Sequence, residues 1–190
     1  MSSNPPISEE DLKKTLVEMA AALTRFHAKY AVIGGMAVAY RSQPRFTKDL
    51  DILVAIPQLI LPGLLHDLQR RGFAFDLATV LREWTQEHMT VLSFRGVRID
   101  WLKPVLPAYL HILDRATEEP WFQQPIRVAS AEGLILLKLL AFRTQDLVDI
   151  ENLVAAYQGT LDLEWIKTEW QSVANLDDPR MRRLLELAAD

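Results

Sequence analysis

The sequence contains no cysteine and only seven glycines in 190 residues. Without cysteine the chain can form neither a disulfide nor a thiolate-ligated zinc site, which is typical of proteins in a reducing compartment. Its most apolar helix-like stretch, residues 134–142, carries Lys138 and is far too short to cross a bilayer. The polar residues 1–6, followed by an acidic segment, do not resemble a signal peptide. We therefore expect a cytoplasmic protein with no membrane partner.

The sequence also lacks an excess of positive charge. Its 21 Lys and Arg face 25 Asp and Glu, so the net charge is −4. No overall basic field attracts the protein to nucleic acid, although a local basic patch is compatible with this balance. The hydrophobic content of 49% is ordinary for a soluble globular chain, and the length suffices for one domain with a substantial core.

The periodicity of apolar residues predicts the order helix, strand, helix, strand, helix, β-hairpin and then mostly helices. The expected helices cover residues 9–26, 36–40, 57–71, 108–116, 131–143, 146–157, 161–170 and 179–189, and the expected strands cover 30–33, 49–55, 73–75, 89–94, 97–102 and 126–129. Residues 77–87 fit a loop or a short helix.

These elements predict an α/β protein with a small mixed β-sheet core flanked by helices and an α-helical C-terminal half. Prolines between residues 104 and 125 favour a boundary there. We expect an α/β core over residues 1–110 and a helical region over 111–190, which together can form one unit.

Three acidic residues in strand segments indicate a metal site. Asp49 and Asp51 lie two apart in one strand, so their side chains point the same way. Neighbouring carboxylates repel each other and are stable together only with a cation between them or with access to solvent. Asp100 lies in a second strand, between two bulky apolar residues. If the strands pair, three carboxylates converge, and oxygen ligands of this kind suit Mg²⁺ or Mn²⁺.

A glycine pair precedes these acids. Gly34-Gly35 ends an apolar run and opens a short helical pattern, an arrangement that suits a phosphate at a helix N-terminus. Each feature also has a simpler interpretation. The glycines can form an ordinary turn, and Asp100 can pair with Arg95 or Arg98 on its hairpin.

The combined pattern resembles the nucleotidyltransferase superfamily typified by DNA polymerase β. The resemblance rests on Gly34-Gly35, on residues 45–51 with the pattern Arg-x-Thr-Lys-Asp-x-Asp, and on residues 99–101 with the pattern Ile-Asp-Trp. Residues 45–51 in particular are similar to AbiEii-type toxins of type IV toxin–antitoxin systems. Residues 136–150, with Lys138 and two later acids, resemble a helical motif of those proteins. The second glycine is often serine in the superfamily, so a hydroxyl contact is missing here.

The resemblance implies transfer of an NMP from an NTP to an acceptor hydroxyl with Mg²⁺ or Mn²⁺. Asp49, Asp51 and Asp100 would be the catalytic residues and metal ligands. Nucleotide binding would fall to Gly34, Gly35, Arg45, Thr47, Lys48 and Lys138, with Arg143 and Asp149 in accessory roles.

Several of these residues have alternative roles. Lys138 can merely extend to the surface, the basic loop side chains can be solvated, and Asp149 can be a first-turn helix acid.

The sequence thus predicts a nucleotidyltransferase whose acceptor is an RNA end, such as that of a tRNA, or a small molecule. A toxin role with an antitoxin protein as partner follows from the AbiEii-type resemblance. The alternative is a catalytically silent nucleotide-binding or regulatory protein of the same fold.

Overall fold

The computed structural model describes residues 7–45 and 47–189. Residues 1–6, which we interpreted as unlike a signal peptide, lie outside the described residues. The helices are α1 (Glu9–Arg25), α2 (Gly34–Arg41), α3 (Leu61–Arg70), α4 (Leu77–Gln86), α5 (Pro107–Arg115), α6 (Ala131–Ala141), α7 (Thr144–Ala156), α8 (Leu163–Gln171) and α9 (Pro179–Ala189). The strands are β1 (Lys29–Ile33), β2 (Asp49–Ala55), β3 (Met89–Phe94), β4 (Val97–Leu102), β5 (Thr117–Trp121) and β6 (Gln124–Val128).

The six strands form one mixed sheet in the order β3-β4-β2-β1-β6-β5. Strand β2 runs parallel to β4 and antiparallel to β1, while β1 and β6 are parallel. The hairpins β3–β4 and β5–β6 complete the two edges. The predicted fold class, a mixed α/β core flanked by helices, is therefore confirmed.

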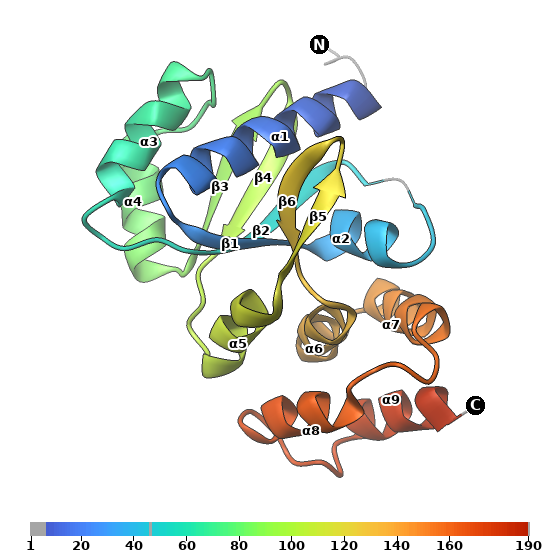
Figure 1. The fold of residues 1–190 in the computed structure, drawn as a ribbon. Coiled ribbons are helices and arrows are strands. Elements are labelled where there is room, and N and C mark those ends of the chain that lie inside the picture. Colours follow the sequence, from blue (N-terminus) through green and yellow to red (C-terminus); the bar gives the residue numbers. More distant parts are fainter. Residues whose placement is uncertain (1–6, 46, 190) are drawn as a thin grey trace.

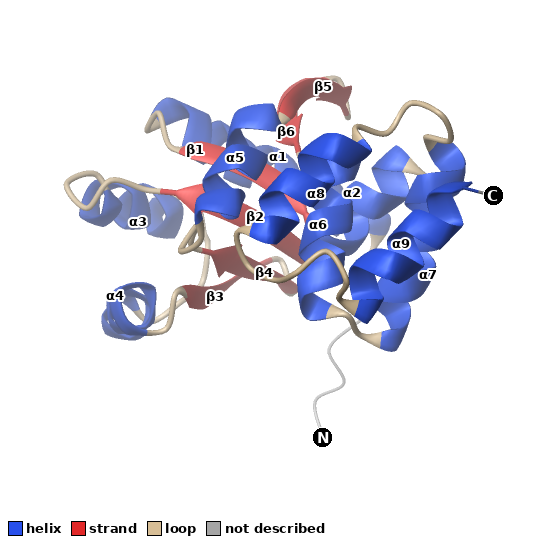
Figure 2. Ribbon diagram, turned by 90° about the horizontal axis from the view of Figure 1, so that it is seen from below, coloured by secondary structure: helices blue, strands red, loops and turns tan. Residues whose placement is uncertain are grey.

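Helices cover both faces of this sheet (Figure 1). Helix α1 crosses one face, and its buried side includes Leu16, Met19 and Leu23. Helices α5 and α6 lie on the other face, and α8 and α9 lie beyond α6 and α7. The view from below in Figure 2 shows α8 and α9 as an outer layer over α6 and α7. The face that carries α5 and α6 also carries the predicted acids.

Helix α1 begins where its sequence predicts. The Ser8 Oγ accepts a hydrogen bond from the Asp11 backbone N–H at 3.1 Å, and the Asp11 carboxylate accepts one from the Ser8 backbone N–H at 3.4 Å. This reciprocal capping satisfies N–H groups that the first turn leaves without a helical partner.

The structure corrects the helix expected over residues 57–71, which begins only at Leu61. Pro57 instead opens a turn, in which its carbonyl accepts a hydrogen bond from the Ile60 N–H. The segment 77–87, where the sequence fits a loop or a short helix, contains helix α4 (Leu77–Gln86), which is capped by Asp76. The strand expected over residues 73–75 is reduced to one bridge between Ala74 and Ser93.

The sequence prediction missed strand β5. Strands β5 and β6 both lie in the segment 111–190, which we expected to be helical. Strand β6 nevertheless pairs with β1 in the central sheet, and β5 pairs with β6. The sheet thus draws on residues from both sides of position 110, while the division into two units stays a prediction. Among the helices in the described part of the chain, none is both long and apolar enough to span a membrane.

Candidate active site

Strand register brings the three acids together on one face of the sheet. Asp51 is the direct partner of Asp100 across the parallel β2–β4 pair, and Asp49 is the partner of Arg98. Side chains at paired positions point to the same face, and residues two apart in a strand share it too. Asp49, Asp51 and Asp100 therefore lie side by side, on the face beneath α5 and α6.

The acids line a cavity of about 600 Å³ between the sheet and helices α2, α5, α6 and α7. Of the predicted site residues, those lining it are Gly34, Gly35, Arg45, Thr47, Asp49, Asp51, Asp100, Lys138 and Arg143. Lys48 is exposed and is not among the lining residues, and Asp149 is buried behind Lys138. Gly34 and Arg143, which are 109 positions apart in the sequence, thus share one cavity.

Repulsion and burial raise the pKa values of two of the acids. The pKa of Asp51 is raised mainly because burial disfavours its charge, then by Asp100, whereas Lys138 opposes the shift. Burial also raises the pKa of Asp100, and Arg98 opposes it. The excess of negative charge on this face makes it a favourable place for a cation.

Asp100 has a partner that the sequence offered as an alternative. The Nε of Arg98 lies 2.8 Å from Asp100 Oδ1. It is not aligned for a hydrogen bond, and this buried oxygen has no hydrogen-bond partner among the described residues. The nearby guanidinium of Arg98 offsets part of the cost of burying this oxygen, which retains the capacity to accept a proton or a cation.

Gly34 must be glycine for two reasons. Its φ of +64° is disfavoured for other residues, and a Cβ built there would lie 1.9 Å from Asp51 Oδ2. Helix α2 starts at this residue without a side-chain cap from Ile33, its N-cap residue. Instead, the Asp51 carboxylate lies against the start of the helix, where the Gly35 backbone N–H opposes the rise of its pKa. A carboxylate thus occupies the end of the helix where an anion is best stabilised.

At Gly35, where the superfamily often has serine, the space for a side chain is taken by Arg45 and Thr47. A Cβ at Gly35 would lie 2.8 Å from Arg45 Nη2 and 3.2 Å from Thr47 Oγ1. The loop between α2 and β2 therefore places a guanidinium where a serine side chain would begin. Thr47 in turn donates a hydrogen bond to the Asp49 carbonyl at 3.4 Å.

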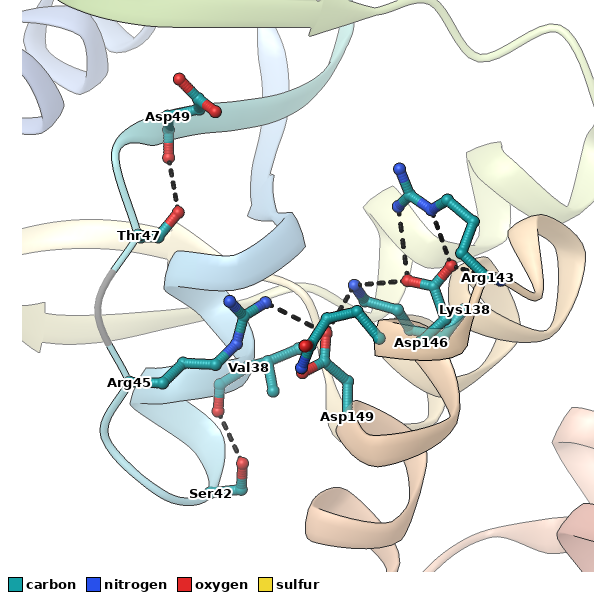
Figure 3. Close-up of polar contacts among 10 residues, drawn as sticks. Val38, Ser42, Arg45, Thr47, Asp49, Lys138, Arg143, Asp146 and Asp149 are labelled. Carbon is teal, nitrogen blue, oxygen red and sulfur yellow. Dashed lines mark hydrogen bonds and ion pairs between the residues drawn. The ribbon is translucent and has the colours of Figure 1, made fainter.

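Lys138 lies at the base of the cavity in a buried ionic network (Figure 3). Its Nζ is 2.8 Å from Asp146 Oδ1 and 2.7 Å from Asp149 Oδ2, and both carboxylates are fully buried. Arg45 Nη2 lies 3.1 Å from the same oxygen of Asp149. Since only 9% of the Lys138 side chain is exposed, the alternative that it extends to the surface is wrong.

Asp146 is a part of this network that sequence reasoning did not assign to the site. Its carboxylate accepts hydrogen bonds from the Arg143 backbone N–H and from Arg143 Nε, both at 2.9 Å. Burial raises the pKa of Asp146, but the hydrogen bonds from Arg143 and Lys138 outweigh it and lower the pKa to about 2. Its position three residues after Arg143, in the first turn of α7, was the available signal.

The network carries one excess positive charge. Lys138, Arg45 and Arg143 face the carboxylates of Asp146 and Asp149. The cations lie beside the start of α2, so this end of the cavity favours an anion. The acids of β2 and β4 lie next to it on the sheet.

The acids have the right chemistry for Mg²⁺ or Mn²⁺, since both ions prefer carboxylate oxygens. In this structure, however, the three carboxylates are not oriented toward a common point. Within residues 7–45 and 47–189, no three His, Cys, Asp or Glu side chains are arranged to hold a metal ion. Asp51 faces the start of α2, and Asp100 lies beside Arg98. Binding an ion therefore requires these side chains to turn away from their present partners.

Solved structures of nucleotidyltransferases share this fold. An antigenic nucleotidyltransferase-like protein from Paracoccidioides brasiliensis matches with a TM-score of 0.54 at 20% identity, over 96% of this chain and 95% of that one. The protein ANT(2")-Ia, in complex with adenylyl-2"-tobramycin, matches with a TM-score of 0.55 at 13% identity, over 85% of this chain and 96% of that one. Lincomycin-bound LnuA, a lincosamide antibiotic adenylyltransferase, matches with a TM-score of 0.52 at 16% identity, over 80% and 99%.

These likenesses define the chain as having the nucleotidyltransferase fold. The sequence itself matches no protein-family model and no curated protein. The AbiEii-type resemblance therefore still rests on the motif residues alone.

Proposed function

We propose that this protein is a metal-dependent nucleotidyltransferase that moves an NMP from an NTP to a hydroxyl group. One observation carries the proposal: Asp51 and Asp100 are register partners with Asp49 beside them, in a cavity whose adjoining end holds Lys138 and the start of α2. The nucleotidyltransferase fold of the chain supports it. Acidic side chains that can hold a metal ion, next to cationic side chains that can bind phosphates, suit the transfer of a nucleotidyl group from an NTP.

The three acids are the proposed ligands of Mg²⁺ or Mn²⁺. When bound, the ion neutralises phosphate charge and lowers the pKa of an attacking hydroxyl. The raised pKa values of Asp51 and Asp100 support this assignment, because a bound cation would offset both the burial and the smaller repulsion that raise them. Asp49 completes the set on the same strand.

The remaining residues hold the triphosphate and move the proton. Lys138 and the first N–H groups of α2 bind the phosphates that leave as pyrophosphate. Asp100 accepts the proton of the attacking hydroxyl while the oxygen of that hydroxyl forms a bond to the α-phosphorus. The bond from that phosphorus to the bridging oxygen then breaks, and pyrophosphate carries the electron pair away. Each role uses a residue that lines the cavity.

The other predicted residues support this end of the cavity. Arg45 and Arg143 supply positive charge, and Thr47 fixes the loop through the Asp49 carbonyl. Lys48 is exposed and attracts the incoming nucleotide. Asp149 holds Lys138 and Arg45 in place rather than touching the substrate.

A small molecule is the acceptor we favour over an RNA end. The structural neighbours include an enzyme with adenylyl-2"-tobramycin and an adenylyltransferase with lincomycin. The net charge of −4 also disfavours a large RNA footprint. A toxin role, with an antitoxin protein as partner, is supported only by the motif resemblance of residues 45–51.

Transfer of label tests the function. The protein is incubated with each NTP labelled at the α-phosphate, Mg²⁺, total RNA and a cell extract of small molecules. We expect label in a small molecule and release of pyrophosphate, both lost in Asp51→Asn and kept in Asp177→Ala. Asp177 is an exposed acid between α8 and α9, so it controls for loss of charge alone.

A nucleotide-binding protein without turnover is the second candidate. It is favoured by the two ion pairs that hold Lys138 and by the position of Arg98 beside Asp100. NTP binding that requires Mg²⁺, with no label in RNA or small molecules and no pyrophosphate, would support it. Label in RNA would keep the enzyme class and overturn the preferred acceptor.

A further inference from the structure

The cavity has two ends of opposite character. One end is formed by the start of α2 with Arg45 and Lys138, and it is cationic. The other end, here called the apolar wall, is formed by Leu102, Tyr109, Leu134 and Leu137. Asp51 lies beside the start of α2, and Asp100 lies two residues before Leu102 on the same face of β4. The proposed function uses the cationic end and the acids, and it leaves the wall without a role.

The apolar wall comes from three separate elements. Leu102 lies on β4 two residues after Asp100, so it shares the face of the acids. Leu134 and Leu137 lie on α6, the helix that carries Lys138. Tyr109 lies on α5, which packs over β1 and β2. The wall is therefore held by packed helices and a strand rather than by a loop.

Tyr109 gives the wall a flat, uncharged surface. It is the only aromatic residue among the described residues that line the cavity. Burial raises its pKa, so the phenol stays neutral. Its side chain is half-buried, which leaves part of the ring for contact with a ligand. Leu134 is fully buried, whereas Leu102 and Leu137 are partly exposed. Together with the half-buried ring of Tyr109 they offer a planar group favourable stacking and apolar contact.

We propose that the apolar wall binds the nucleobase of the NTP, with the ring of Tyr109 packed against it. This inference rests on the proposed function and assigns a second part of the same substrate. An NTP is anionic at one end and flat and weakly polar at the other, which matches the two ends of the cavity. Stacking on an aromatic side chain accepts every base, since each base has a π-face.

The wall also predicts weak selection among bases. Discrimination between bases requires hydrogen bonds to their edges. The hydroxyl of Tyr109 is the one polar side-chain group in the wall as defined above. We therefore expect ATP, GTP, CTP and UTP to bind within a few-fold of one another.

Binding of ATP and of inorganic tripolyphosphate, both with Mg²⁺, separates the two ends of the cavity. We expect Tyr109→Ala to weaken ATP binding about tenfold, a typical effect of losing one stacked base, and to leave tripolyphosphate binding unchanged. Tyr109→Phe keeps the ring and should bind ATP as the wild type does. Leu110→Ala, at an exposed neighbour that does not line the cavity, is the matched control.

Each outcome of this experiment decides the inference. Unchanged ATP binding by Tyr109→Ala overturns it and leaves the wall to the acceptor. Equal weakening of ATP and tripolyphosphate also overturns it, because Tyr109 would then act through the fold. If Tyr109→Phe is as weak as Tyr109→Ala, the hydroxyl and not the ring makes the contact. If the wild type binds neither ligand, the proposed function itself fails.

Discussion

Replacing Asp149 by asparagine should destabilise the protein strongly, although the side chain keeps its shape. Asp149 is fully buried and contacts Lys138 at 2.7 Å and Arg45 at 3.1 Å. Removing one member of a buried ion pair costs about 3–5 kcal/mol, because the remaining charge is left buried. Asp146 still pairs with Lys138, and Arg45 is partly exposed, so we expect the lower value, about 3 kcal/mol.

Thermal unfolding measures this effect. For a chain of this size each kcal/mol shifts Tm by roughly 2–4 °C, so Asp149→Asn should lower Tm by about 6–12 °C. Glu151→Gln, on the same helix, removes a charge whose ion pair with Arg183 is half exposed, and it should change Tm by about 1 °C at most. If the two variants unfold at the same temperature, the buried network does not hold α6, α7 and the loop together.

Three further predictions concern the acids and the glycine beside them. Gly34→Ala places a side chain at a positive φ and in collision with Asp51, whereas Gly96→Ala has only the positive φ. In urea unfolding, Gly34→Ala should therefore lower the free energy of unfolding by at least about 1 kcal/mol more than Gly96→Ala does. Because the pKa of Asp51 is raised on folding, its ionisation costs stability as pH rises through the folded value. Asp51→Asn should therefore have a higher Tm than the wild type at pH 7, and this difference should vanish below the ordinary pKa of 3.8; a constant difference across pH would contradict it. Arg98 lowers the pKa of Asp100, so Arg98→Ala should raise it in an NMR titration of the Asp100 carboxyl, and an unchanged titration would refute the pairing.

The site was partly predictable because its central elements follow local rules. Alternation in β2 places Asp49 and Asp51 on one face, and the Arg95-Gly96 turn sets the hairpin that carries Asp100. The sequence alone did not show that β2 and β4 are neighbours, which depends on the order of strands in the sheet. The structure supplies that order, and with it the pairing of Asp51 and Asp100.

Other features were beyond local patterns. Strand β5 carries Pro120 and two glutamates, a composition typical of a loop, and it is tolerated because β5 lies at the sheet edge. The ion pairs of Lys138 require α7 to fold back against α6 after the left-handed residue Phe142. Tyr109 reaches the cavity only through the packing of α5, and no spacing in the sequence marks it.

Binding of Mn²⁺ to the acids is the most direct test of the proposed metal site. Free Mn²⁺ is followed by its electron paramagnetic resonance signal as protein is added, for the wild type, Asp51→Asn and the control Asp177→Ala. We expect the wild type and Asp177→Ala to remove Mn²⁺ from solution, Mg²⁺ to compete with it, and Asp51→Asn to bind it at least tenfold more weakly. Equal binding by all three proteins, or none by the wild type, would contradict the assignment of Asp49, Asp51 and Asp100 as metal ligands.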